Sequence, residues 1–398
     1  MDFTLPDEIT KLAAQTRKFI EDEIIPLESD PAHYDEHENI RIDLLNTMRE
    51  RAKSAGLWAP QAPKDRGGMG LPVIGWAALY EEANRSIFGP AVMNCAAPDD
   101  GNINLLSKIG TPAQKQWFLD PLIAGEVKSS FAMTEPHPGS GSDPSMMQTT
   151  ATYADGVWKI TGRKWYITGA AEASHFILVA RTSSDTRKGL TAFLFHKDQP
   201  GWHIERRIPI MGPEEHGGHC ELVFDGLEIK DENRLMEVGD GLKVTQIRLG
   251  PARLTHCMRW LGLAKRCMEI AADYIAVREG FGIRLADRES VQIKMGECAH
   301  DIAVGRLLVM HAAWQLDQGQ FARAEISSAK IHVAQTLHKV ADTAIQLNGA
   351  RGYSKDTVLE WIYRYARQAR LVDGADEVHK MVLARQYAEH QTDFWKWG

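Results

Sequence analysis

The loop at residues 131–143, FAMTEPHPGSGSD, stands out as a candidate ligand-binding segment. A short apolar strand is expected to run into Thr134, Glu135 and Pro136, and a glycine- and serine-rich loop follows. Main-chain N–H groups and hydroxyls in such a loop can surround a polar ligand. The same residue types also form plain turns between domains. Composition alone leaves both interpretations open.

Other common chemical motifs are missing from the sequence. There is no GxxxxGK[ST] and no GxGxxG, so the usual phosphate-binding fingerprints are absent. GGMG at 67–70 is better interpreted as a turn, and without GxSxG there is no candidate nucleophile elbow. His216, His219 and Cys220 lie close together, but there is no second ligand cluster, so we predict no metal site.

The composition limits the class of protein. The 398 residues include 46 Lys and Arg against 53 Asp and Glu, a net charge of −7, so nucleic acid is not expected as a partner. No stretch approaches the roughly 20 apolar residues of a membrane span, and none is predicted. The N-terminus has no apolar signal region, and the five cysteines form no CxxC pair. Both features favour a cytoplasmic protein with reduced thiols.

Hydrophobic periodicity divides the chain into three predicted domains. Residues 1–128 show helical spacing, and residues 129–238 show the period of two that is typical of strands, with Asp155-Gly156 as a hairpin turn. Residues 239–398 return to helical spacing in long segments, which favours a helical bundle. The long helices of this last domain are predicted at 249–277, 287–318, 321–348 and 376–391.

Five motifs resemble signatures of the acyl-CoA dehydrogenase family. FAMTEPHPGSGSD resembles the family's TEPxxGSD signature, and KWYITGA at 164–170 is similar to its second signature. Three C-terminal segments also look like family elements in the right order: REGFG at 278–282, QLNGARGY at 346–353 and VDGADEVH at 372–379. The likeness covers essentially the whole chain and is closest to the subgroup sometimes called acyl-CoA dehydrogenase 10/11-like.

The resemblance implies a mainly α fold with a central β domain. An N-terminal helical domain, a middle β-barrel or sandwich and a C-terminal four-helix bundle would follow one another. It also implies FAD bound without a Rossmann fold, which would explain the missing glycine fingerprint. Arg278 and Gln346–Ala350 would reach the FAD of a neighbouring subunit, so a homo-oligomer, either a dimer or a tetramer, is implied.

The resemblance also assigns residues to the two ligands. The backbone of Phe131–Thr134 would lie along the flavin, Tyr166 would cover its face and Thr168 would bond near N5. Ser142, Arg253 and Gly374 would face the acyl-CoA thioester. The implied FAD-binding residues are Phe131, Met133, Thr134, Ser140, Tyr166, Thr168, Arg278, Phe281, Gln292, Gln346, Gly349, Ala350, Ala375 and Glu377.

Two departures from the family pattern affect these assignments. His137-Pro138 lengthens the first loop by two residues, so the roles of Ser140 and Ser142 stay open. The family usually has Glu-Gly-Thr where this chain has Asp373-Gly374-Ala375. The alternative base position of some members, just before the helix arginine, is Ala252 here, which leaves Asp373 as the implied base.

A carboxylate suits the implied reaction. Removal of a hydrogen α to a thioester needs a nearby base while flavin N5 accepts hydride from the β-carbon. Burial between flavin and acyl chain is expected to raise the pKa of that base. Aspartate withdraws its oxygens by roughly 1.5 Å relative to glutamate, and a displacement near 1 Å can cost about 100-fold in rate. The alternative for Asp373 is a purely structural role as a helix N-cap, which Asp376 could provide equally well.

The leading hypothesis is an FAD-dependent acyl-CoA dehydrogenase of fatty-acid β-oxidation. It would make a trans-2-enoyl-CoA and pass electrons to an electron-transfer flavoprotein. One alternative is a nitroalkane-oxidase-like flavoenzyme, because that branch resembles the same fold and uses an aspartate base. Another is a non-catalytic scaffold that binds flavin or acyl-CoA.

Overall fold

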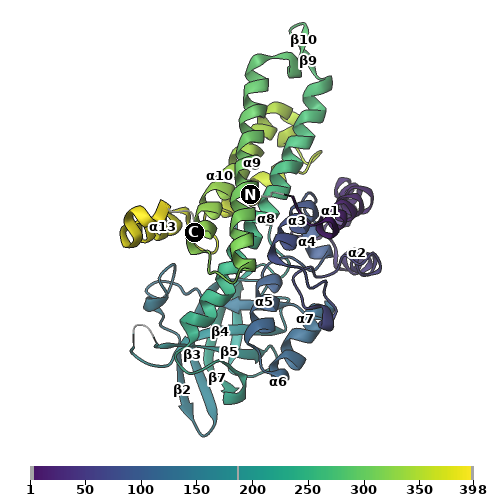
Figure 1. Cartoon of the computed structure of the whole chain (residues 1–398). Coiled ribbons are helices and arrows are strands. Elements are labelled where there is room, and N and C mark those ends of the chain that lie inside the picture. Colours follow the sequence, from purple (N-terminus) through teal and green to yellow (C-terminus); the bar gives the residue numbers. More distant parts are fainter. Residues whose placement is uncertain (1–3, 186–187, 396–398) are drawn as a thin grey trace.

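The computed structural model describes residues 4–185 and 188–395 (Figure 1). Helices form the N-terminal part, strands the middle and helices again the C-terminal part, so the chain is mainly α-helical with a central β region. The N-terminal helices are α1 (Asp7–Phe19), α2 (Ile42–Ser54), α3 (Val73–Ala83), α4 (Gly89–Val92), α5 (Asp99–Ile109), α6 (Pro112–Gln114) and α7 (Asp120–Ala124).

Helix α1 follows from its apolar stripe. Ile9, Thr16 and Phe19 are buried on one face, and a wider π-type turn continues the stripe from Ile20 to Ile24. Helix α3 is buried on nearly all sides because it packs against α1 and against two long helices of the C-terminal part. A helix buried on nearly all sides belongs to the centre of a domain, and its two buried glutamates, Glu81 and Glu82, are paired with Lys265 and Arg306.

The middle region is one eight-stranded sheet in the order β6-β7-β3-β2-β4-β5-β8, with β1 paired in parallel to β4. Asp155 and Gly156 both have positive φ and join β2 to β3, so the predicted hairpin is confirmed. The strands are β1 (Ser129–Ala132), β2 (Thr150–Ala154), β3 (Val157–Thr168), β4 (His175–Arg181), β5 (Leu190–His196), β6 (Trp202–Arg207), β7 (His219–Lys230) and β8 (Arg234–Leu235).

Strands β4 and β5 are buried on both faces. Phe176 and Phe193 pack into the core of the β region, whereas Ile177 and Leu194 join the larger helical core. Alternate residues of a strand point to opposite faces, so these two strands tie the sheet to the helices. The β region is thereby fixed against the rest of the chain.

The C-terminal part is built on three long helices, α8, α9 and α10. Figure 1 shows these helices running together from the sheet to a small hairpin, β9–β10, at the far end of the molecule. The elements are α8 (Gly241–Val277), β9 (Glu279–Gly280), β10 (Ile283–Arg284), α9 (Glu289–Asp317), α10 (Arg323–Asn348), α11 (Ala350–Tyr353), α12 (Leu359–Gln368) and α13 (Asp376–His390). No helix in the described ranges is long and apolar enough to cross a membrane.

Helix α8 begins eight residues before the predicted start at 249. The prediction placed Pro251 at a helix N-terminus, where proline is tolerated, but Pro251 lies inside the continuous helix. It is almost fully enclosed by the surrounding core. Tertiary packing therefore carries the helix through a residue that would end an isolated one.

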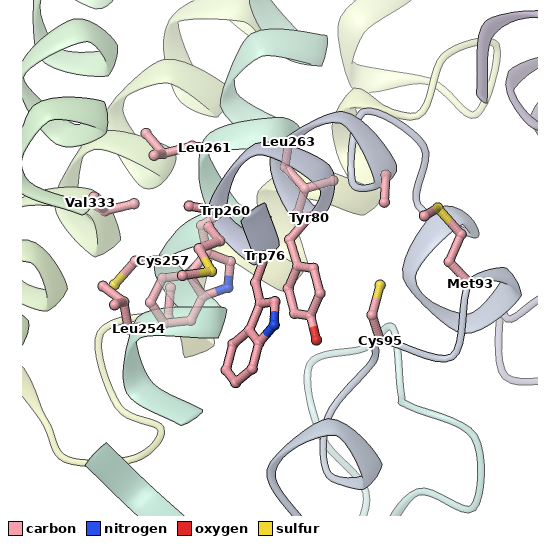
Figure 2. Packing of buried hydrophobic residues seen from close by; sticks show 14 of the residues in the cluster. Trp76, Tyr80, Met93, Cys95, Leu254, Cys257, Trp260, Leu261, Leu263 and Val333 are labelled. Atoms are coloured by element: carbon pink, nitrogen blue, oxygen red, sulfur yellow. The ribbon is translucent and has the colours of Figure 1, made fainter. Parts of the chain in front are cut away.

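The helical core is continuous between the two helical parts. Figure 2 shows Trp76 and Tyr80 of α3 facing Leu254 and Trp260 of α8. Trp260 is 1% exposed and Tyr80 is fully buried. This packing fixes the stretch of α8 that carries the site described below. All five cysteines are free and buried.

Candidate active site

One large cavity lies where the sheet meets the helical bundle. Its volume is about 2480 Å³, and its walls come from the loop after β1, the end of β3, α8, the start of α10 and the α12–α13 region. Sites for one small molecule usually occupy about 300–1,000 Å³. The cavity therefore has room for more than one large ligand.

Half of the predicted site residues line this cavity. Those at its walls are Phe131, Met133, Thr134, Ser142, Tyr166, Thr168, Arg253, Asp373 and Gly374. The others lie elsewhere: Ser140, Arg278, Phe281, Gln292, Gln346, Gly349, Ala350, Ala375 and Glu377 are not part of its lining. The two signatures TEPxxGSD and KWYITGA and the loop before α13 thus converge from three separate elements.

The β-sheet side of the cavity is held by main-chain bonds. The amide of Trp165 donates to the carbonyl of Thr134 over 2.9 Å, which joins the loop after β1 to strand β3. Tyr166 has φ 52°, an uncommon conformation for a bulky residue, and its side chain is half exposed at the cavity. Such local strain is often found at ligand sites.

Thr168 is part of a polar chain. Its hydroxyl lies 3.0 Å from Nδ1 of His219, whose Nε2 lies 2.8 Å from Glu215. Burial opposes the charged ring, but the bond to Glu215 raises the pKa of His219 above its ordinary value. A protonated His219 donates to Thr168 and leaves the hydroxyl proton free for a ligand.

The two serines of the glycine-rich loop differ in position. Ser140 is fully buried, and its hydroxyl donates to the carbonyl of Met133 over 3.3 Å. Ser142 lies on the cavity wall. The two extra residues, His137 and Pro138, thus leave only the second serine next to the ligand space.

The loop that carries Asp373 is fixed through its carbonyl groups. Arg253 Nε donates to the carbonyl of Asp373 over 2.7 Å, and Lys330 Nζ donates to the carbonyl of Gly374 over 3.3 Å. Asp373 has φ 52° and Gly374 has φ 102°. Arg253 therefore uses its guanidinium group to hold this loop. The family resemblance had assigned Arg253 to the substrate instead.

The Asp373 carboxylate has an imidazole ring and arginine side chains as its neighbours. His256 Nε2 lies 3.4 Å and Arg248 Nη1 lies 3.9 Å from Oδ2. Burial alone would raise the pKa of Asp373, but His256, Arg248 and Arg253 together hold it well below its ordinary value. The expectation of a raised pKa is therefore wrong in direction, because the sequence argument counted burial and missed these neighbours.

The N-cap alternative for the acidic residues is also wrong. Helix α13 begins at Asp376, its N-cap is Ala375, and no side chain caps it. Asp376 instead accepts from Arg370 Nε over 2.8 Å. The carboxylate of Asp373 is thus left without a capping role.

Most of the predicted FAD residues outside the cavity lining lie on other parts of the C-terminal region, and Arg278 and Gln346–Ala350 were expected to reach a neighbouring subunit. Arg278 follows the end of α8, 25 positions after Arg253, which is about 38 Å along a helix axis. Phe281 in the adjoining hairpin is fully exposed, and Gln292 lies on α9. Gln346, Gly349 and Ala350 lie at the junction of α10 and α11. Glu377 is exposed in the first turn of α13.

Sequence reasoning assigned Arg253 to the site but missed the other basic residues of the cavity. Eight Lys and Arg line it against three Asp and Glu, although the whole chain has a net charge of −7. Among them, Arg248 is buried, stacks over the ring of Phe131 at 4.7 Å and donates to Asn102. The available signal was a set of basic residues close together at 248, 253 and 256. None of the five motifs includes them.

Comparisons with known proteins agree with this architecture. The chain matches the family descriptions "Acyl-CoA dehydrogenase, N-terminal domain" at residues 6–126, "Acyl-CoA dehydrogenase, middle domain" at 130–227 and "Acyl-CoA dehydrogenase, C-terminal domain" at 239–388. It superposes on butyryl-CoA dehydrogenase from Megasphaera elsdenii with a TM-score of 0.85 at 28% identity, covering 98% of this chain and all of that one.

Curated relatives fall into two groups by length. "Probable acyl-CoA dehydrogenase FadE2" of Mycobacterium tuberculosis is 33% identical over 97% of this chain and 96% of the relative. (R)-Benzylsuccinyl-CoA dehydrogenase of Thauera aromatica is 32% identical, with 97% of each covered. Acyl-CoA dehydrogenase family member 11 of Gallus gallus is 34% identical over 93% of this chain but only 49% of the relative. The chain spans about half the length of relatives of that kind.

A basic cavity between a β-sheet domain and a helical bundle, with the Asp373 carboxylate at its wall, is an arrangement suited to large anionic ligands. With the three domain matches and the full-length relatives, it assigns the chain to a family. The chain belongs to the acyl-CoA dehydrogenase family.

Proposed function

We propose that the protein is an FAD-dependent acyl-CoA dehydrogenase that converts an acyl-CoA to a trans-2-enoyl-CoA. One observation carries the proposal: Asp373, whose Oδ2 has no hydrogen-bond partner among the described residues, lies at the wall of a basic cavity that also contains the predicted flavin-facing residues. Basic side chains complement the phosphates of both FAD and coenzyme A. Asp373 would be the α-proton base.

The residues of the cavity fit FAD. Phe131, Met133 and Tyr166 offer apolar surface for a flat ring, and Thr168 offers a hydroxyl with a protein partner already in place. Thr245 adds a buried hydroxyl at the same cavity, and no described residue bonds to it. A bound flavin supplies the acceptor for hydride from the β-carbon. The chain itself would hold the thioester, exclude water and take up the α-proton at the Asp373 carboxylate.

The depressed pKa of Asp373 suits a base that must be ionised before substrate arrives. Binding of an acyl chain removes water and disfavours the charge, so the nearby cations offset that cost. These neighbouring groups also hold the carboxylate of Asp373 in place. It extends from a loop in which the carbonyls of Asp373 and Gly374 accept hydrogen bonds from Arg253 and Lys330. The shorter side chain of aspartate is thereby supported by an unusually well-fixed backbone.

The wider assignments are parts of the same proposal. Exposed apolar side chains at the far end of α8 and in its hairpin, Val277 and Phe281, support a homo-oligomer in which that end meets another subunit. We propose a homotetramer in the cytoplasm that acts in fatty-acid β-oxidation, with an electron-transfer flavoprotein as the acceptor. The family resemblance supports these assignments.

The first experiment is an anaerobic absorption spectrum of the purified protein, before and after addition of a panel of acyl-CoAs. The panel includes straight, branched and aryl-substituted acyl groups. Bleaching of the flavin by one class would support the proposal and name the substrate class. Nitrite release from nitroethane in air, without bleaching by any acyl-CoA, would instead favour the nitroalkane alternative. Failure to bind FAD on reconstitution would contradict both.

A further inference from the structure

His256 lies next to the proposed base without being part of the cavity wall. It is three residues after Arg253 on α8, so the two side chains leave the same face of the helix. Arg253 bonds to the main-chain carbonyl of Asp373, and His256 Nε2 approaches Oδ2 of the same residue at 3.4 Å. Successive turns of one helix thus contact the backbone and the side chain of the base.

The other ring nitrogen of His256 has a partner that fixes the tautomer. Arg259 Nη2 lies 3.3 Å from Nδ1. A guanidinium group can only donate, so Nδ1 must accept and its lone pair is occupied. The ring proton then belongs on Nε2, the nitrogen that faces Asp373.

Arg259 is itself held rigidly. It is 3% exposed, and its Nη1 donates to Asp100 Oδ2 over 2.6 Å and to the carbonyl of Cys95 over 2.8 Å. Thr255 donates to the same Asp100 oxygen over 2.7 Å. The charge of Arg259 is therefore compensated by Asp100, and the guanidinium cannot turn away from His256 without leaving a buried carboxylate unpaired.

The plane of the imidazole ring is fixed by stacking. His256 lies 5.2 Å from the ring centre of Trp260 with 23° between the planes. Trp260 packs in the core against α3, as Figure 2 shows, and Lys330 Nζ lies over it at 5.1 Å. Because stacking fixes the plane of the His256 ring and Arg259 fixes its tautomer, the Nε2–H bond points in one direction.

The environment of this pair is strongly cationic. The charged and titratable groups around Asp373 and His256 come from four elements: Arg248, Arg253 and Arg259 on α8, Asp100 on α5, Lys330 on α10 and His379 on α13. Asp373 Oδ2 is buried without a hydrogen bond among the described residues. His256 Nε2, at 3.4 Å, lies nearer to Oδ2 than Arg248 Nη1, at 3.9 Å.

We propose that His256 is a positioning residue for the base. In the enzyme–substrate complex its neutral Nε2–H donates to Oδ2 of Asp373, holds that oxygen back and leaves Oδ1 to accept the α-proton. His256 gains and loses no proton in this step. Catalytic hydrogen bonds are often long before substrate binds, which is consistent with the 3.4 Å contact. The inference rests on the proposed function.

A pair of substitutions separates the hydrogen bond from simple packing. In His256→Gln the amide nitrogen reaches the place of Nε2, and in His256→Asn it reaches only the place of Nδ1. We expect His256→Asn to lower the rate of flavin reduction by about 10- to 100-fold at pH 6 and to move the acid limb of kcat/KM upward by about one pH unit. The KM should change little. His256→Gln should stay closer to the wild-type protein in both respects.

A second measurement needs no turnover. In holoenzyme labelled with ¹⁵N-histidine, the ring signals that disappear in His256→Gln should report a neutral ring with the proton on Nε2. A proton on Nδ1, or on both nitrogens, would overturn the inference. Equal rates and equal pH profiles for the Gln and Asn variants, with matching flavin content and melting temperature, would also overturn it. A wild-type protein that no acyl-CoA reduces would contradict the proposed function and leave the NMR result to be judged alone.

Discussion

Two carboxylates of this chain, the buried Glu135 and the partly buried Asp373, have opposite surroundings. Glu135, in the loop after β1, accepts four bonds at 2.6–3.1 Å, from Lys164 Nζ and from the amides of Ser140, Gln148 and Thr149. Asp373, in the loop before α13, has His256 and Arg248 nearby, but its Oδ2 accepts no hydrogen bond from the part of the chain that the structure describes. Both have a pKa below the ordinary value, although burial opposes this in each case.

The difference separates a structural carboxylate from one suited to chemistry. The lone pairs of Glu135 are occupied, so it joins the glycine-rich loop to β3 and has no capacity for a proton from outside. Asp373 gains electrostatic stabilisation from a distance and keeps its lone pairs available. A lowered pKa is common to both carboxylates. What distinguishes them is the number of hydrogen bonds that each one accepts.

The largest expected effect is on catalysis, from removal of the Asp373 charge. Asp373→Asn should lower the rate of flavin reduction by about 10²–10⁴-fold, the usual contribution of a general base. Stability should fall less than in the Glu135 variant below, because Arg248 and Arg253 keep their bonds to Asn102 and to the residue-373 carbonyl. Anaerobic stopped-flow absorbance measures the rate. Reduction at the wild-type rate would exclude Asp373 as the base.

The second largest effect is expected on the stability of the fold. It comes from Glu135, whose carboxylate already accepts four hydrogen bonds. Glu135→Gln places an NH₂ group among four donors and leaves the Lys164 charge unpaired, so the free energy of unfolding should drop by about 3–5 kcal/mol. Urea denaturation measures it. Glu50→Gln, which breaks an exposed pair with Lys53, is the matched control and should cost less than about 1 kcal/mol. Similar losses in the two variants would remove the distinction between the carboxylates.

Gly374 tests how closely the Asp373 loop must be held. Its φ is 102°, and an added Cβ would lie 3.0 Å from His379 Nε2, so alanine must shift the loop. Gly374→Ala should lower kcat by about 10- to 100-fold, since a 1 Å displacement has that order of effect. Gly296→Ala, in an open position on α9, is the control and should be neutral or stabilising. An unchanged kcat in Gly374→Ala would show that the loop tolerates movement.

Much of the fold could be predicted from the periodicity of hydrophobic residues in the sequence. Strand β4 occupies residues 175–181 as the run HFILVAR predicted, and α9 and α10 begin within two residues of their predicted starts. Local pattern decides such elements because one face of each is buried. The early start of α8 was missed because proline normally ends a helix, and only the packing around Pro251 shows why it does not.

The site was accessible in part. Short motifs identified Asp373, Tyr166 and Thr168, which line one cavity although they come from separate segments. Arg248 and His256 were missed because they belong to none of the five motifs. Their relation to Asp373 arises from the approach of the α13 loop to α8, a long-range contact that no local pattern encodes.

The smallest expected effect comes from Arg248. Its Nη1 is 3.9 Å from Asp373 Oδ2, farther than His256, and its charge favours the ionised carboxylate. Arg248→Gln should therefore raise the pKa of Asp373 and move the acid limb of kcat/KM upward by about one pH unit or less. The rate at pH 8 should change little, because Asp373 is ionised there in both proteins. A downward shift would mean that Arg248 acts mainly on another group, and the contrast with Glu135 would then rest on His256 and Arg253 alone.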